Sequence, residues 1–352
     1  LSIPNIIAPT TQSLVVIAET SYIGLIGTEA LAAMALVFPL IMLTQMTSSG
    51  AMGGGVSSAT ARALGSGNVD RAEAVALHAV VIAVTAGLAF MAVFLTAGPW
   101  LLSLLGGRGR VLAEAIVYAQ MFFSGVLAIW LFNTLVSIVR GTGNMRLSAS
   151  TTISVALLQI ALGGALSLGL GPIPKLGIRG VALGQVLAFL AGSSFLFWLL
   201  ASGRSRVRLS LGRGRLDREL FRDILKVGAV ACLSPLQSVL TVLIMSGLVA
   251  RLGTEALAGY GIGVRLEFLL VPIAFAIGVA SVPMVGMAIG AGHVDRARET
   301  AWTAGILSGL IVGAVGVAAI LFPDLWVSLF TDSEAVKAST RTYLGLAGLG
   351  FP

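Results

Sequence analysis

The chain has 352 residues, of which 57% are hydrophobic and only 11% are charged, and its mean hydropathy is +0.99. An average soluble domain is roughly 25% charged, so this composition excludes a soluble globular enzyme, a disordered chain and a coiled coil. A single cysteine, Cys232, excludes a disulfide framework and a multi-cysteine metal site. The formal net charge of +7 could indicate nucleic acid, depending on where the basic residues lie.

Long apolar stretches dominate the chain. A helix crosses a bilayer in about 20 apolar residues, and stretches that are apolar all round are typical of membrane helices. In chain order the predicted spans cover residues 1–26, 30–61, 74–107, 115–139, 147–174, 180–203, 227–250, 256–294 and 300–323. A tenth span is expected to begin near Tyr343 and to be cut off at Pro352. We therefore expect an all-α integral membrane protein, present here as a fragment.

The basic residues predict the orientation. If the N-terminus is cytoplasmic, 14 of the 22 Lys and Arg residues lie in inside loops and 7 in outside loops, as the positive-inside rule requires. The densest basic run, Arg204 to Lys226, joins two spans and should end in an amphipathic helix from Leu216. We expect membrane lipids with anionic headgroups, and no nucleic acid, beside this run.

An internal repeat organises the spans. The segment at 27–32 recurs word for word at 253–258, the segment at 65–72 resembles that at 290–297, and Tyr118 matches Tyr343, at offsets of 226 and 225. Such matched segments indicate duplication. One period holds six spans, and an even number predicts a parallel repeat of two six-helix lobes. The predicted parts are an amino-terminal lobe (1–203), a cytoplasmic basic linker (204–222) and an incomplete carboxy-terminal lobe (223–352).

Short motifs in a fixed order add a family resemblance. They are Pro4 with the segment at 19–24, the segments at 27–33, 61–72, 140–144 and 171–178, Arg265-Leu266-Glu267, and Val282-Pro283. In this order and spacing they resemble the multidrug and toxic compound extrusion (MATE) family along nearly the whole chain. The resemblance implies a transporter and not an enzyme, with no cofactor, no catalytic residues and no structural metal. It also implies a helix-bending role for Pro4 and an ion-coupling role for Glu19.

The chain departs from the family pattern at three places. Glu19 stands where many members have Asp. In the fifth span, Gln159 and Gly163 stand where relatives often have Asn and Asp, so the second acid of the amino-terminal cavity is absent. In the seventh span, Gln237 or Ser238 stands where some members have Glu.

Two carboxylates, Glu19 and Glu267, lie well within predicted spans. A charge in the bilayer costs a few kcal/mol or more, so each is an ion-coupling candidate that can take up a proton or ligate sodium. Asn5, Gln12 and Glu19 lie seven residues apart on one helix face, which Pro9 shares as a second helix-bend candidate. The alternatives are water contact at the outer interface for Glu19 and a structural charge pair for Glu267.

Uncharged polar residues within spans are candidates for the substrate cavity, with contacts between helices as the alternative. These candidates are Asn5, Gln12, Asn133, Gln159 and Gln237. Six apolar residues could line a soft cavity for bulky cations or simply pack: Phe38, Met42, Met46, Phe122, Phe123 and Trp130. The glycine cluster at 50–55 lacks the Lys and Ser/Thr of a phosphate loop, which favours close helix approach or a hinge.

Together these features predict a monomeric, cation-coupled antiporter in a bacterial inner membrane. It would export a small amphipathic, cationic organic compound in exchange for protons or sodium, by alternating access of two lobes. One carboxylate serves either ion, so both stay open. The alternatives are a lipid-linked oligosaccharide flippase or exporter of the same superfamily, which would need basic residues in its spans, and a membrane-embedded transferase, for which only His78 qualifies.

Overall fold

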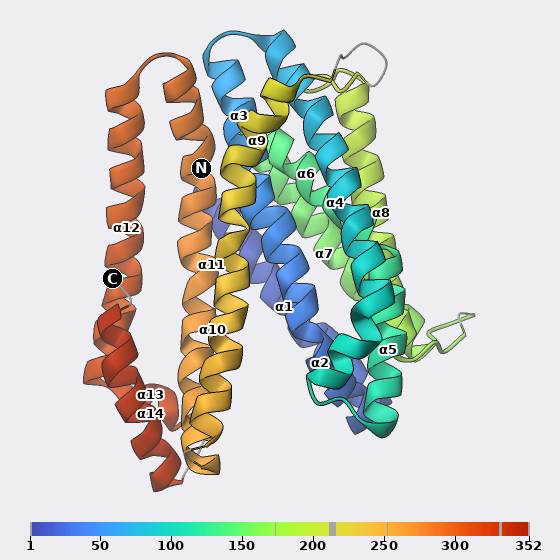
Figure 1. Cartoon of the computed structure of the whole chain (residues 1–352), viewed down its shortest axis with the longest axis vertical. Coiled ribbons are helices and arrows are strands. Elements are labelled where there is room, and N and C mark those ends of the chain that lie inside the picture. Colours follow the sequence, from blue (N-terminus) through green and yellow to red (C-terminus); the bar gives the residue numbers. More distant parts are fainter. Residues whose placement is uncertain (1, 173, 211–215, 252, 331–332, 351–352) are drawn as a thin grey trace. The chain divides into compact units, whose positions relative to one another are not determined.

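The computed structural model describes residues 2–172, 174–210, 216–251, 253–330 and 333–350, and every regular element in these ranges is a helix (Figure 1). This confirms the all-α prediction. The helices are α1 (Ser2–Ile26), α2 (Thr28–Gln45), the π-helix η1 (Met46–Met52), α3 (Gly53–Gly65), α4 (Val69–Leu104), α5 (Gly109–Ser124), α6 (Val126–Gly141), α7 (Met145–Leu168), α8 (Ile178–Ala201), α9 (Arg218–Ala231), α10 (Leu233–Ala250), α11 (Thr254–Gly290), α12 (Val294–Leu321), α13 (Pro323–Val327), α14 (Glu334–Ala347) and the 3₁₀ helix η2 (Gly348–Gly350).

Within the described residues, six helical segments are long and apolar enough to cross a membrane. A seventh results if α5 and α6, which are bent by 48° relative to each other, form one span. The bend falls at Gly125, where a Cβ atom would lie only 2.8 Å from the Cβ of Val186 in α8. The close approach of α8 therefore requires glycine at the break. The total of nine complete spans stays a prediction.

Helix boundaries repeat with the offsets seen in the sequence. Thr28 begins α2 and Thr254 begins α11, whereas Gly65 ends α3 and Gly290 ends α11. The starts of α4 and α12, at Val69 and Val294, keep the offset of Gly65 and Gly290. The starts of α5 and α14 keep it as well. The repeat therefore extends from sequence to secondary structure.

The chain divides into two compact units: unit 1 comprises Leu1–Pro235 and Val282–His293, and unit 2 comprises Leu236–Ser281 and Val294–Pro352. Aromatic side chains fill the core of unit 1. Phe94 stacks on Phe123 with ring centroids 4.3 Å apart, and Phe90 packs against Trp130 at 5.2 Å. Phe122, Phe123 and Trp130 are at most 1% exposed. These three candidates for a cavity lining are therefore packed core residues.

Two copies of the repeated segment contact each other inside unit 1. A Cβ atom built at Gly65 of α3 would lie 2.7 Å from the Cα of Met287 in α11, and one built at Gly290 would lie 2.9 Å from the carbonyl carbon of Arg62. At the repeat offset, Gly65 corresponds to Gly290 and Arg62 to Met287. The contact is thus reciprocal, as in an interface related by a two-fold axis.

The predicted lead-in helix after the basic run is α9, which begins at Arg218 and buries Leu220 and Ile224. Asp217 caps its N-terminus by accepting a 2.9 Å hydrogen bond from the backbone of Glu219. The backbone N–H of Asp217 donates to Nε2 of His78 at 2.7 Å. These contacts fix the end of the linker to α4 within unit 1.

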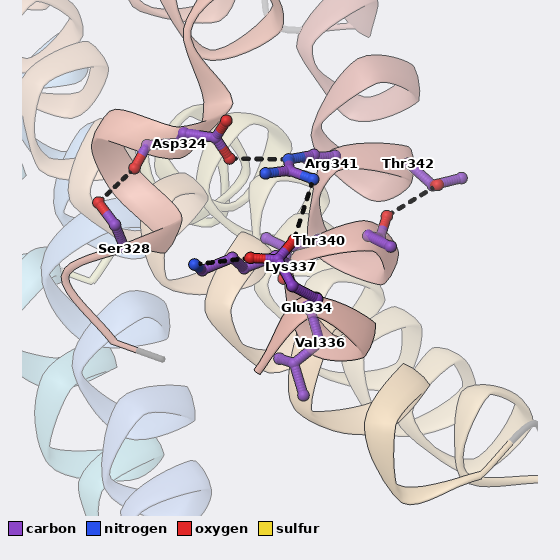
Figure 2. Close-up of polar contacts among 9 residues, drawn as sticks. Asp324, Ser328, Glu334, Val336, Lys337, Thr340, Arg341 and Thr342 are labelled. Carbon is purple, nitrogen blue, oxygen red and sulfur yellow. Dashed lines mark hydrogen bonds and ion pairs between the residues drawn. The ribbon is translucent and has the colours of Figure 1, made fainter. Parts of the chain in front are cut away.

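In unit 2, α14 begins at Glu334, well before the start predicted for the tenth span at Tyr343. Lys337 and Arg341, two of the seven basic residues that the orientation prediction counts in outside loops, lie on this helix. Figure 2 shows their contacts: Lys337 pairs with Glu334 at 3.0 Å, and Arg341 pairs with Asp324 at 2.7 Å and with Glu334 at 3.7 Å. Because the first turns of α14 are charged, a search for apolar residues does not detect where this helix begins.

Candidate functional site

Glu19 lies on the buried face of α1. Thr11, Val15, Glu19 and Ile23 follow one another at intervals of four residues, and all are at most 6% exposed. This spacing places them on one side of a helix, whereas Thr20 is exposed. Glu19 itself is 5% exposed and precedes the end of α1 by about two helical turns, roughly 10 Å along the helix axis. The side chain of Glu19 therefore has little surface in contact with solvent.

The partner of Glu19 is Gln159 of α7, which is 1% exposed. Its Nε2 donates a 2.7 Å hydrogen bond to Oε1 of Glu19. The two helices are close here, because a Cβ atom on Gly164 of α7 would lie 3.0 Å from the ring of Tyr22 in α1. The structure therefore joins two candidates that are far apart in sequence. An amide orients a carboxylate without neutralising it, so the carboxylate can still accept a proton or a monovalent cation.

Tyr118 of α5 is a member of this site that the sequence analysis noted only as a mark of the repeat. Its side chain is 1% exposed and lies near enough to Glu19 for the charge of that carboxylate to act on the phenol, although no described hydrogen bond joins the two residues. Its counterpart Tyr343 donates a short hydrogen bond from its hydroxyl to Oε1 of Glu267 in unit 2. The signal that could have found both acidic surroundings is the tyrosine itself, kept at the same register in both copies of the repeat.

Glu267 of α11 is half-buried. Tyr343, its hydrogen-bond donor, is held edge-on by Tyr260 with ring centroids 5.1 Å apart. Arg265 is directed elsewhere, with its guanidinium 5.5 Å from the ring centroid of Phe330. Among the described residues no ion pair joins Arg265 to Glu267. The acid therefore has a phenol, and not a cation, as its partner.

Asn133 of α6 lies in a separate polar cluster. Its Nδ2 donates to Ser48 Oγ at 2.8 Å and to Gln45 Oε1 at 3.1 Å, beside the π-helix η1. These bonds support the interpretation of Asn133 as a contact between helices. The glycine cluster at 50–55 runs from η1 into α3, and a Cβ atom on Gly55 would lie 2.9 Å from the backbone nitrogen of Gly228 in α9. Close helix approach therefore explains Gly55, whereas a Cβ atom on Gly54 would meet nothing within 4 Å.

The remaining candidates are not brought to Glu19 by any described contact. Gln237 of α10 is exposed. Four others lie on α1, but their side chains fall outside the described residues: Pro4, Asn5, Pro9 and Gln12. In the part of the chain that the structure describes, no group of three or more His, Cys, Asp or Glu side chains could hold a metal ion.

The chain is similar in sequence to curated proteins that are named as transporters or multidrug resistance proteins. The chain is 28% identical over 305 residues to a protein named FAD transporter from Shewanella oneidensis, a match that covers 85% of this chain and 66% of the relative. It is 25% identical over 352 residues to the probable multidrug resistance protein NorM from Thermotoga maritima, covering 99% of this chain and 75% of the relative. The chain thus spans about two thirds to three quarters of these relatives.

Solved structures agree. A structure described as the outward-facing conformation of a multidrug resistance MATE family transporter of the MOP superfamily matches all of this chain and 79% of its own, at 26% identity and a TM-score of 0.85. The MatE family model matches residues 4–163 and 231–352, two segments that begin near the repeat offset from each other. The chain belongs to the MatE family of multidrug and toxic compound extrusion transporters.

Proposed function

We propose that the protein is a secondary active antiporter that exports amphipathic, cationic organic compounds in exchange for protons or sodium ions. The observation that carries this proposal is the buried carboxylate of Glu19, held by a neutral amide within an apolar helix. An ionisable group inside a membrane is costly and marks ion pathways. The multidrug transporters among the relatives support the export of organic compounds.

The contact between α1 and α7 offers a coupling step. A hydrogen bond to an ionised carboxylate is roughly twice as strong as one between neutral groups. Protonation of Glu19 would weaken its bond to Gln159, whereas sodium would draw the carboxylate and the amide oxygen of Gln159 to one ion. Either event changes the energy of the contact between the two helices. Coupling then requires only that the ion binds the two lobe arrangements with different affinity.

Glu267 is the second coupling candidate. Its hydrogen bond with Tyr343 depends on the charge of the carboxylate in the same way. The rest of the proposal follows the sequence: a monomer in a bacterial inner membrane with a cytoplasmic N-terminus, surrounded by lipid, without a cofactor.

The relative named FAD transporter supports a second candidate function. A flavin dinucleotide is also amphipathic but anionic, so the substrate would carry the opposite charge.

A transferase is less favoured by the structure. Both ring nitrogens of His78, its only candidate base, are engaged by backbone groups: Nδ1 lies 2.7 Å from the carbonyl oxygen of Ala74, and Nε2 accepts from Asp217 at 2.7 Å. A flippase remains the alternative with a lipid-linked substrate.

The test is export of a fluorescent organic cation under imposed proton or sodium gradients. In everted membrane vesicles that contain the protein, this efflux activity is measured as uptake of the dye into the vesicles, because their cytoplasmic face points outward. Glu19→Gln should reduce gradient-driven efflux to background, while Glu29→Gln, an exposed acid, serves as the matched control. Gln159→Leu should lower efflux about tenfold or more, because a hydrogen bond to a charged group contributes about 1.5–3 kcal/mol.

Unchanged gradient-driven efflux in Glu19→Gln would refute the assignment of that residue. Transport of FAD but not of the dye would establish the second candidate. No transport of either compound by well-inserted protein would favour a lipid-linked substrate.

A further inference from the structure

The segment after α8, residues 202–210, is the arginine strap of unit 1. Its side chains alternate: Arg204, Arg206 and Arg208 are exposed, while Val207 and Leu209 are buried at 0% and 3% exposure. The backbone is also fixed, because Leu209 donates from its N–H to the carbonyl of Leu200 at 3.0 Å and Arg208 to a carboxylate oxygen of Glu73 at 3.2 Å. Figure 1 places this segment at the end of α8. The strap is thus a docked segment with one basic face.

The three arginine side chains have no ion-pair partner among the described residues. The guanidinium of Arg204 lies over the ring of Trp198 at 4.8 Å from its centroid, and Nη1 of Arg206 donates to the carbonyl of Thr142 at 3.3 Å. The carboxylate of Glu73 accepts from the backbone of Arg208 and not from its guanidinium. Three positive charges therefore point outward uncompensated by the described side chains.

An apolar face continues from the strap along α8. Trp198 is 50% exposed, Phe195 44% and Leu190 50%, and the rings of Phe195 and Trp198 lie 6.2 Å apart. Tryptophan at the end of a span is typical of the membrane–water interface. An acyl chain fits the apolar face, and a headgroup would then lie at the level of the arginines.

We propose that Arg204, Arg206 and Arg208, together with Trp198, bind the headgroup phosphate of an anionic phospholipid in the cytoplasmic leaflet. Arginine recognises phosphate through paired hydrogen bonds. A soluble polyanion would use the charges but not the exposed rings of α8, so the lipid is the occupant that accounts for both. This site does not depend on the antiport mechanism.

The experiment measures binding of phosphatidylglycerol to the purified protein in detergent by native mass spectrometry, with phosphatidylcholine as the neutral lipid. The test variant is R204Q/R206Q. The matched control is R296Q/R298Q, which removes the same charge from exposed positions in another loop predicted to be cytoplasmic. An exposed ion pair contributes up to about fivefold to binding, so the loss of two arginines in the test variant should raise the apparent Kd for phosphatidylglycerol by up to about 25-fold. The control variant and phosphatidylcholine binding should change little.

Trp198→Leu provides a second test that leaves every charge in place, and it should weaken phosphatidylglycerol binding a few-fold. An equal loss of binding in the control variant would overturn the proposal, because it would show a general effect of surface charge. Unchanged binding in R204Q/R206Q would also overturn it. Displacement of phosphatidylglycerol by soluble glycerol phosphate at equal concentration would instead identify a site for free phosphate esters.

Discussion

The reciprocal glycine contact between α3 and α11 makes a prediction about both copies of the repeat. In Gly65→Ala, the new methyl group would lie 2.7 Å from the Cα of Met287, well inside an ordinary carbon–carbon contact of about 3.5–4.0 Å. The helices must then separate by roughly 1 Å, and such overpacking typically costs about 1–3 kcal/mol. Gly290→Ala meets the backbone of Arg62 in the same way and should cost a similar amount.

Gly54 is the control in the same helix, because nothing lies within 4 Å of a Cβ atom built on it. Gly54→Ala should be neutral or stabilising by up to about 1 kcal/mol, the difference in helix propensity between the two residues. The double variant G65A/G290A should cost less than the two single variants together. Once the first methyl group has separated the helices, the second meets less resistance, and such coupling is typically about 0.5–3 kcal/mol.

The assay is thermal unfolding of the purified proteins in one detergent, followed by the fluorescence of their tryptophans. We expect the Tm values of both single variants to fall below that of the wild type, and that of Gly54→Ala to match or exceed it. If Gly65→Ala proves as stable as Gly54→Ala, the prediction is refuted, because α3 and α11 would then not be in close contact at Gly65. If the two single losses add in the double variant, the glycines do not share one contact.

Three further variants test other contacts of unit 1. Asn133→Leu removes the donor to two acceptors beside the π-helix and should cost about 1–3 kcal/mol in thermal unfolding, with gradient coupling retained. Asp223→Asn removes the 2.7 Å ion pair with Arg62, whose partners are 29% and 23% exposed; we expect a loss of at most about 1 kcal/mol that disappears in high salt. His78→Phe leaves the N–H of Asp217 without its acceptor, and limited proteolysis should then cut the basic linker faster than in the wild type.

The helical architecture could be predicted from the sequence because a membrane requires apolar residues all round a helix. The start of α14 could not be predicted from the sequence for the same reason. Its first turns carry Glu334, Lys337 and Arg341, which find partners in each other and in α13, so an apolar pattern begins only near Tyr343. The π-helix η1 could not be predicted from the sequence either, since its wider turns leave no periodicity distinct from that of the surrounding helix.

Glu19 could be selected from the sequence alone because the cost of a buried charge singles out intramembrane acids. Its partner could not be selected. Gln159 and Asn133 are both polar residues in apolar spans, yet one binds the carboxylate and the other binds Gln45 and Ser48. Only the packing of helices far apart in sequence separates these roles.

The duplication preserves a tyrosine at one register, with an acid nearby in each unit. Tyr118 and Tyr343 are repeat partners, but their acids are not: Glu19 corresponds to Met245, and Glu267 falls at the register of Met42. The tyrosine register is therefore shared by both halves, whereas the carboxylate comes from α1 in unit 1 and from α11 in unit 2. A search of the sequence for repeated acids misses both sites. A search for the repeated tyrosine finds them, because Tyr343 donates a hydrogen bond to one acid and Tyr118 lies within range of the charge of a different acid.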